Sequence, residues 1–421
     1  MSESVTFWLT IIVFAVTYLG LALGGFPGLR IDRTGIALTG AAAVLGCRLL
    51  NFDEAVQSVD FATIVLLLGM MIVVEYLRRA DFFDILAGRA LAHVHQPSTL
   101  LAVVMALSGV LSALLVNDVV CLALTPLVLH VTRHLKIDPK PHLIGLAIAS
   151  NVGSTATLTG NPQNMIIGGL SQISYLRFAA KLAPIAIVGL VVSYLITLVL
   201  FRSALNAGQS DNLHLGDKPA DEPAPMNSKK KSLLIKSLIV TSAAVALFFA
   251  GAPMAIVALG AAAILLLDRV KPEKIYHRVD WGLLVMFAGL FVVVHAFEVH
   301  VMHYAGVDKW TVLRSSPIAM LSAASAILSN LVSNVPAVLL FKPIIPDMPG
   351  EIQETAWLAL AMSSTLAGNL TVLGSVANLI VVEKARKSGV IITLADYCRA
   401  GIPVTIVTLL IGMAWLALAT Y

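Results

Sequence analysis

Long runs of apolar residues, separated by short polar stretches, follow one another along the whole 421-residue chain. A transmembrane helix needs roughly 20 consecutive apolar residues, and most of these runs approach that length. The pattern predicts an all-α polytopic membrane protein. The predicted segments are 6–24, 35–50, 61–77, 98–130, 143–170, 182–201, 237–250, 252–267, 281–297, 316–344, 356–382 and 401–420.

Two of these segments, 98–130 and 316–344, are too long for one crossing and carry polar residues near their middle. Asn117 and Asp118 interrupt the first segment, and the stretch 329–336 interrupts the second. Polar groups at bilayer depth are costly unless protein covers them. Each segment is therefore predicted to be a re-entrant hairpin, in which two short helices meet at a polar tip.

The loop charges support this prediction. Loops 78–97 and 131–142, on either side of the first long segment, both carry three basic residues. Basic loops lie on the cytoplasmic side, so the segment is expected to enter and leave the membrane from that side. The same rule places the polar stretch 203–236 in the cytoplasm as a flexible linker. Residues 80–94 mix apolar and charged side chains, which predicts an amphipathic helix in the membrane interface.

Composition narrows the class of protein further. Hydrophobic residues make up 58% of the chain and charged residues 12%, whereas soluble domains have about 45–50% and about 25%. This excludes an ordinary soluble enzyme and a disordered protein. The net charge of +4 is mild, and its basic residues lie in short loops, so no nucleic-acid partner is expected. The lipid bilayer is the predicted environment, with the bacterial inner membrane as the predicted location.

The two halves of the chain repeat in the same order. Residues 35–45 resemble 255–265, and the offset drifts from 220 there to 214 near residue 157. Each half holds five spans and one hairpin, and an odd number of spans inverts the second copy. The matching pairs are Asp60 with Asp280, Gly69 with Gly289, Asn117 with Asn334, Pro126 with Pro343, Thr157 with Thr371, Gly160 with Gly374 and Asn164 with Asn378. The predicted organisation is a first repeat over 1–202, the linker over 203–236 and a second repeat over 237–421.

Two stretches inside apolar spans are rich in Ser, Thr, Asn and Gly. They are 149–164 and its repeat mate 367–378. Glycine and proline predict a broken helix at each stretch, with freed backbone groups and amides facing a cavity. Close helix packing by small residues is the alternative, but the density and duplication of the polar residues favour a site. The predicted substrate-binding residues are Asn117, Asn151, Ser154, Thr155, Thr157, Gly160, Asn161, Asn164, Asn330, Ser333, Asn334, Asn369, Thr371, Gly374, Ser375 and Asn378.

Asp118 is the only carboxylate in the two hairpins and the two breaks. An ionisable residue inside a membrane is a functional hypothesis by default, and Asp118 is predicted to carry the coupling ion. Capping a hairpin helix is the alternative. Glu75 and His295 occupy equivalent repeat positions, where interfacial side chains are expected and a proton relay is the alternative. No enzyme motif, metal site or cofactor site is present in the sequence pattern, so neither catalysis nor a cofactor is expected.

Residues 116–126, which begin Val-Asn-Asp and end Thr-Pro, resemble the Asn-Asp…Thr-Pro segment of the ion transporter superfamily. The stretch 154–164 and the tip 329–336 are similar to the same group, and the likeness covers nearly the whole chain. Within the superfamily, the chain resembles the ArsB-type arsenite and antimonite efflux permeases and related anion permeases. The divalent anion/sodium symporters and the NhaD-type sodium/proton antiporters are more distant.

The resemblance implies a scaffold part and a transport part, with a substrate between the hairpin tips and the breaks. In the symporters, Ser-Asn-Thr triplets hold carboxylate and sodium. Here 150–152 and 333–335 both have the sequence Ser-Asn-Val, which favours the arsenite branch. The expected function is export of a small oxyanion or metalloid, arsenite or antimonite first, by proton-coupled alternating access.

The cysteines limit how arsenite could bind. Only Cys121 lies near a predicted tip, whereas Cys47 falls in a scaffold span and Cys398 in a predicted cytoplasmic loop. Arsenite is therefore expected to bind as a hydroxylated species through Asn, Ser and Thr groups. The rival functions are sodium-coupled transport of citrate or another dicarboxylate, and a channel subunit for a cytosolic ATPase that docks on 229–231. A homodimer is compatible with this architecture.

Overall fold

The computed structural model is helical, with no strand among the residues that it describes. These residues are 2–25, 30–91, 94, 96–207, 228–268, 270–302 and 316–419. The helices are α1 (Glu3–Leu23), α2 (Arg33–Gly46), α3 (Phe52–Ser58), α4 (Phe61–Arg79), α5 (Phe82–Leu91), α6 (Pro97–Leu114), α7 (Asn117–His134), α8 (Lys140–Ser154), α9 (Pro162–Ser171), α10 (Tyr175–Leu200), α11 (Arg202–Ala207), α12 (Ser228–Phe249), α13 (Met254–Leu266), α14 (Pro272–Tyr276), α15 (Trp281–Phe297) with the π-turn η2 (Glu298–Met302), α18 (Pro317–Val332), α19 (Asn334–Phe341), α20 (Gly350–Ala367), the 3₁₀ turn η4 (Val372–Gly374), α21 (Val376–Lys387) and α22 (Leu394–Ala419).

Within the described part of the chain, seven helices are long and apolar enough to cross a membrane: α1, α4, α6, α10, α12, α15 with η2, and α22. The predicted spans 35–50 and 252–267 form the shorter helices α2 and α13, of 14 and 13 residues. Large apolar side chains on α1, α10 and α22 are exposed, as expected for helices that contact lipid tails rather than water. The prediction of an all-α multi-pass membrane protein is confirmed.

The first long segment returns to the side from which it enters. Helices α6 and α8 run parallel, because His142 at the start of α8 contacts the Pro97 carbonyl at the start of α6 (Nε2 to O, 3.0 Å). Thr157, just after α8, donates to the Ala113 carbonyl at the end of α6. Since α7 connects these two parallel helices, it must run antiparallel to both. Helices α6 and α7 are therefore the predicted hairpin.

The second hairpin, α18 and α19, follows the same logic. Helices α18 and α20 run parallel: Ser325 contacts Ser363, and further along Asn330 donates to the Ala367 carbonyl at 2.9 Å. The tip is a single residue, Ser333, whose φ of 77° turns the chain sharply between the two helices. The two predicted hairpins thus occupy 97–134 and 317–341.

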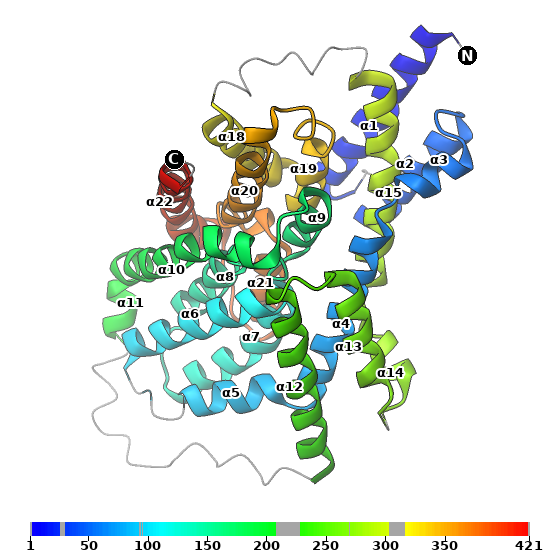
Figure 1. Ribbon diagram of the computed structural model, residues 1–421. Helices are drawn as coiled ribbons and strands as arrows, with labels where there is room; N and C mark the ends of the chain where they lie inside the picture. Colours follow the sequence, from blue (N-terminus) through cyan, green and yellow to red (C-terminus); the bar gives the residue numbers. More distant parts are fainter. Residues whose placement is uncertain are drawn as a thin grey trace.

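The four scaffold helices are α2, α4, α13 and α15, and each packs on a helix from the other half of the chain. Helix α2 packs on α15, and α4 packs on α13, along one side of the molecule (Figure 1). A Cβ added to Gly69 of α4 would lie 2.7 Å from the carbonyl oxygen of Ala258 in α13. A Cβ added to Gly289, the repeat mate of Gly69, would lie 2.8 Å from the carbonyl oxygen of Ala37 in α2. Both helix crossings therefore require a glycine at the equivalent repeat position, as expected for a duplicated unit.

Local sequence also repeats at the helix starts. Asp60 caps α4 by accepting from the backbone N–H of Ala62 at 3.1 Å, and Asp280 caps α15 by accepting from that of Leu283 at 2.9 Å.

The amphipathic helix expected at 80–94 is α5. The linker prediction is wrong at both ends, since 203–207 belong to α11 and 228–236 to α12. Residues 208–227, between these helices, lie outside the described residues.

Candidate functional site

Two helices are broken at the predicted stretches. Helix α8 ends at Ser154 and α9 begins at Pro162, where Asn161 caps the new helix by accepting from the Asn164 N–H at 2.8 Å. In the second half, α20 ends at Ala367 and α21 begins at Val376. Proline and an asparagine cap restart the first helix at a fixed residue, and the unwound backbone between the helices stays inside the protein.

The same hydrogen bonds hold both breaks. The Asn164 Nδ2 donates to the carbonyls of Ser154 and Thr157, at 3.1 and 3.0 Å. The Asn378 Nδ2 donates to the carbonyls ten and seven residues before it, at 2.7 and 3.0 Å. These amides satisfy carbonyls that the interrupted helices leave free. The two breaks are therefore held by matching hydrogen bonds, at the positions that the sequence repeat pairs.

Asn151 joins the two breaks. Its Nδ2 donates to the Oδ1 atoms of Asn369 and Asn378, each at 2.9 Å. Its Oδ1 accepts from the Asn117 Nδ2 and from the Ser375 Oγ, each at 3.0 Å. One side chain of the first repeat therefore holds a hairpin tip of its own half and three residues of the other half.

Thr365 has the matching role in the second half. Its Oγ1 donates to the Asn164 Oδ1 at 3.3 Å and accepts from the Asn161 Nδ2 at 3.2 Å and the Gln163 Nε2 at 3.3 Å. Neither Thr365 nor Gln163 is among the site residues that the sequence predicts. The signal was present, because the repeat offset of 214 pairs Asn151 with Thr365.

The hairpin tips contact the breaks. The backbone N–H of Asn117 donates to the Gly160 carbonyl at 3.0 Å. In the amide orientation that suits its neighbours, the Asn334 Nδ2 donates to the carbonyls of Gly374 and Ser364, at 3.0 and 3.2 Å. The convergence of two tips on two breaks agrees with the arrangement that the sequence predicts.

Four of the predicted substrate-binding residues hold the backbone of the breaks and tips: Asn330, Thr371, Thr155 and Ser333. Asn330 accepts from the Thr371 Oγ1 at 3.4 Å and donates to the carbonyl end of α20. Thr155 donates to the Asn151 carbonyl at 3.2 Å, and Ser333 forms the turn of the second tip. These side chains fix the shape of the breaks and tips.

The central residues are buried and uncharged. Asn151, Asn161, Asn164, Asn369 and Asn378 are each at most 1% exposed. The Asn369 Nδ2 is wholly buried and has no hydrogen-bond partner among the described residues. A buried unpaired amide group costs free energy, so this donor is a candidate contact for a substrate.

Asp118 follows Asn117 at the start of α7 and is half-buried. Its backbone N–H donates to the Asn117 Oδ1 at 3.0 Å, and no hydrogen bond or ion pair joins its carboxylate to another described residue. Asp280, at the start of scaffold helix α15, is near enough to interact with it electrostatically. Asp118 therefore lies where the hairpin tip approaches the scaffold.

Two expectations need correction. Cys398 is not in a loop: it lies in α22, with its Sγ 3.7 Å from the Leu370 carbonyl of the second break. Glu75 is not an interfacial side chain. It is 6% exposed and forms ion pairs with Arg78 and Arg79, at 2.7 and 3.0 Å, because a buried carboxylate needs paired charges. His295, its repeat mate, pairs with Glu298 at 3.2 Å.

Membrane-spanning helices, re-entrant hairpins and two broken helices that converge on a polar centre define a multi-pass membrane transporter. The model of the citrate transporter family (CitMHS) matches residues 9–367, and the chain belongs to this family. The resemblance to the ion transporter superfamily is thereby confirmed.

Several curated proteins are similar over nearly their whole length. The silicon efflux transporter LSI3 of Oryza sativa subsp. japonica is 30% identical, with 96% of each chain covered. The 46 kDa membrane protein of Mycobacterium leprae is 29% identical, with 97% of each covered. The putative transporter arsB of Dictyostelium discoideum is 26% identical, covering 91% of this chain and 87% of that protein. These similarities support an anion or solute transporter.

The crystal structure of the YdaH transporter of Alcanivorax borkumensis has a similar fold, with a TM-score of 0.56 over 99% of this chain and 97% of that chain. The two sequences are 14% identical. The likeness therefore concerns the fold alone, and it agrees with the helical architecture described above.

Proposed function

We propose that this protein is a secondary transporter that exports a small hydroxylated metalloid or oxyanion, with arsenite or antimonite as the first candidate. The observation that carries the proposal is the buried, uncharged network around Asn151, in which the Asn369 Oδ1 accepts from Asn151 and the Asn369 Nδ2 has no partner among the described residues. A hydroxylated metalloid presents both O–H donors and oxygen acceptors. Amide side chains offer both functions, whereas the ionised carboxylates of a dicarboxylate offer acceptors only.

The relatives support the same class of cargo. One relative is a silicon efflux transporter and another is a putative arsB transporter. Both silicon and arsenic form small hydroxylated species in water. Export by this chain, in a bacterial inner membrane with the start of α12 on the cytoplasmic side, is part of the proposal.

Proton coupling is proposed through Asp118. Asn117 accepts from the backbone N–H of Asp118 and donates to Asn151, so the residue next to Asp118 in the chain is bonded to the centre of the network. A proton gained or lost at Asp118 changes the charge beside the hairpin tip. The electrostatic neighbourhood of Asp280 then makes the contact between tip and scaffold depend on that charge.

The test is arsenite accumulation in everted membrane vesicles, with a proton gradient imposed and ATP absent. Wild-type protein should accumulate arsenite, and an uncoupler should abolish accumulation. Asp118→Asn should lose gradient-driven accumulation and keep downhill exchange, whereas Asp53→Asn, an exposed acid on α3, should behave as wild type. Full gradient-driven transport by Asp118→Asn would remove Asp118 from the coupling role.

Sodium-coupled citrate transport is the second candidate, and the family description favours it. Right-side-out vesicles with a sodium gradient and labelled citrate separate the two functions. Sodium-dependent citrate uptake, without arsenite accumulation in everted vesicles, would replace the metalloid assignment. Transport without ATP in either vesicle type would also exclude the hypothesis that this protein is a channel subunit driven by a cytosolic ATPase.

A further inference from the structure

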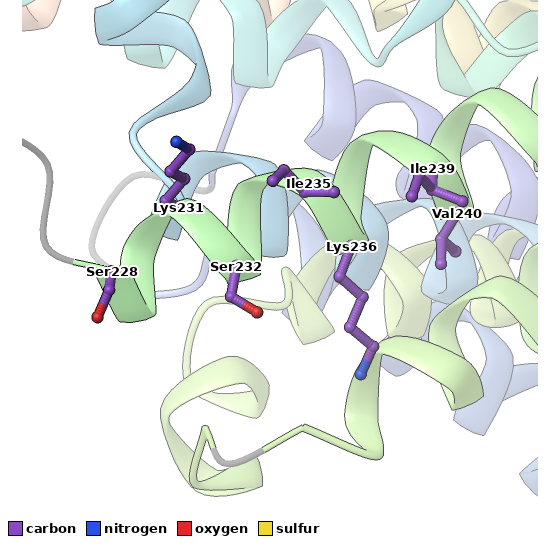
Figure 2. A pocket seen from close by; sticks show the side chains of 7 residues that line it. All are labelled: Ser228, Lys231, Ser232, Ile235, Lys236, Ile239 and Val240. Carbon is purple, nitrogen blue, oxygen red and sulfur yellow. The ribbon is translucent and has the colours of Figure 1, made fainter.

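One face of α12 carries a groove of about 520 Å³ at the start of the helix (Figure 2). Helix α12 begins Ser-Lys-Lys-Lys and continues as an apolar span. The groove therefore lies where a membrane-crossing helix leaves the bilayer. Its lining residues are Ser228, Lys231, Ser232, Ile235, Lys236, Ile239 and Val240.

These side chains form two ridges with helical spacing. Lys231, Ile235 and Ile239 recur every four residues on one ridge, beside a second ridge that begins with Ser228 and Ser232. A helix rises about 1.5 Å per residue, so the groove extends about 18 Å along α12. Polar and basic groups line its outer end, and apolar groups line the end that points into the bilayer.

The charge at the outer end is positive. Lys230 pairs with Asp81 at 2.5 Å, and Lys236 pairs with Asp268 at 3.2 Å. None of the ion pairs among the described residues neutralises Lys231, and its side chain is exposed. The outer end of the groove therefore presents the ammonium group of Lys231, which points to the side of α12 opposite the hydroxyls of Ser228 and Ser232 (Figure 2).

The inner end is apolar and open. Ile235 is 50% exposed and Ile239 is 63% exposed, so the apolar surface continues directly from the basic end. A soluble phosphate would contact Lys231 but would make no contact with the isoleucines. A molecule with an anionic head and a hydrocarbon tail contacts both ends of the groove.

We propose that this groove binds one anionic phospholipid from the leaflet that the start of α12 faces. The phosphate lies beside Lys231, and one acyl chain follows Ile235 and Ile239, which lie on the same side of α12 (Figure 2). A basic side chain next to a transmembrane helix is attracted to anionic lipid by about 1 kcal/mol. Charge complementarity at Lys231 thus selects an anionic lipid over a zwitterionic one.

The position of the site gives the lipid a structural effect. Helix α12 packs on α4 and α13, and the Lys230–Asp81 ion pair joins its start to the turn that precedes α5. Asp81 has a φ of 56°, so this turn is a constrained joint. A lipid held at the neighbouring Lys231 keeps the start of α12 against that joint and is expected to raise the Tm of the protein.

The test uses full-length protein purified in a non-ionic detergent. Native mass spectrometry or fluorescence titration compares phosphatidylglycerol with phosphatidylcholine of the same acyl chains. Wild type should bind phosphatidylglycerol more tightly, and Lys231→Gln should weaken that binding about fivefold. Lys271→Gln, which removes an equally exposed lysine before α14, should leave binding unchanged.

A second variant tests the acyl-chain contact. Ile239→Ser should weaken binding of both lipids, because the hydroxyl replaces apolar surface. Equal binding of the two lipids by wild type, or equal loss in Lys231→Gln and Lys271→Gln, would overturn the proposal. Displacement of phosphatidylglycerol by glycerol phosphate at similar concentration would also overturn it, since the site would then recognise soluble phosphate.

Discussion

Helices α4 and α13 of the scaffold meet at Gly69, where a backbone carbonyl occupies the space of a side chain. Helices α8 and α20 meet through Asn151 and Thr365, whose side chains reach the opposite break. Shape alone holds the first contact, and exchangeable hydrogen bonds hold the second. In a bilayer, close packing by small residues fixes helices, whereas polar pairs are individually weak. The α4–α13 contact therefore depends on close packing at a glycine, whereas the α8–α20 contact depends on polar side chains.

The largest expected effect comes from adding a side-chain atom where α6 and α8 pack closely against each other. Gly153→Ala would place a Cβ 2.1 Å from the carbonyl oxygen of Gly109 in α6. Backbone on both sides leaves nothing flexible to move, so we expect no folded, monodisperse protein. Fluorescence-detected size-exclusion chromatography measures this. Gly260→Ala in α13 is the control, because its Cβ would meet nothing within 4 Å. A normal Gly153→Ala profile would show that α6 and α8 can separate.

The next effect comes from removing the bridge between the breaks. Asn151→Ala deletes four hydrogen bonds among buried groups and should cost about 2–4 kcal/mol in stability. Substrate transport should fall at least tenfold, because a loss of about 1.4 kcal/mol in the barrier already lowers a rate tenfold. Vesicle transport and Tm are the measurements.

Two controls sharpen this result. Ser193→Ala in α10 removes a buried hydroxyl that has no partner among the described residues, so both Tm and transport should stay near wild type. The exchange of Asn151→Thr with Thr365→Asn should transport better than either single variant, since the two positions are repeat mates. Equal transport by the exchange and the single variants would contradict the symmetric role.

A scaffold glycine gives a smaller effect of a different kind. Gly69→Ala should lower stability by about 2 kcal/mol by overpacking α4 against α13. Transport per folded molecule should hardly change, because no hydrogen bond of the breaks is touched. The Tm and the transport rate, normalised to folded protein, separate the two. A strong loss of transport at normal Tm would show that the scaffold takes part in the motion.

The smallest effect concerns the charged end of α21. Burial, followed by the nearby charges of Arg78, Lys387 and Arg278, lowers the pKa of Lys384. The unfolded chain then holds this proton more tightly, so stability should rise as the pH increases from the lowered pKa towards the ordinary lysine value. Lys384→Gln should flatten this alkaline rise in Tm, by a fraction of the effect of Gly69→Ala. An unchanged pH profile would show that these cations do not act on Lys384.

Much of the candidate site was predictable because its signals are local or repeated. Gly160 and Pro162 interrupt an apolar span, and the offset of 214 carries the same break to Gly374. Thr365 was missed because it precedes the polar stretch 367–378, and only the repeat offset that pairs it with Asn151 marks it. Its role depends on Asn164 and Asn161, about 200 residues earlier in the chain.

The sequence by itself determined the helical membrane class, the two hairpins and the positions of both breaks. Hydropathy, proline and glycine act within a few residues, so these features can be inferred without a fold. Only the tertiary structure decided that α2 pairs with α15 and α4 with α13, and that Asn151 and Thr365 each reach the break of the other half. These contacts come from the packing of one inverted half against the other, and no local pattern records which distant surfaces will meet.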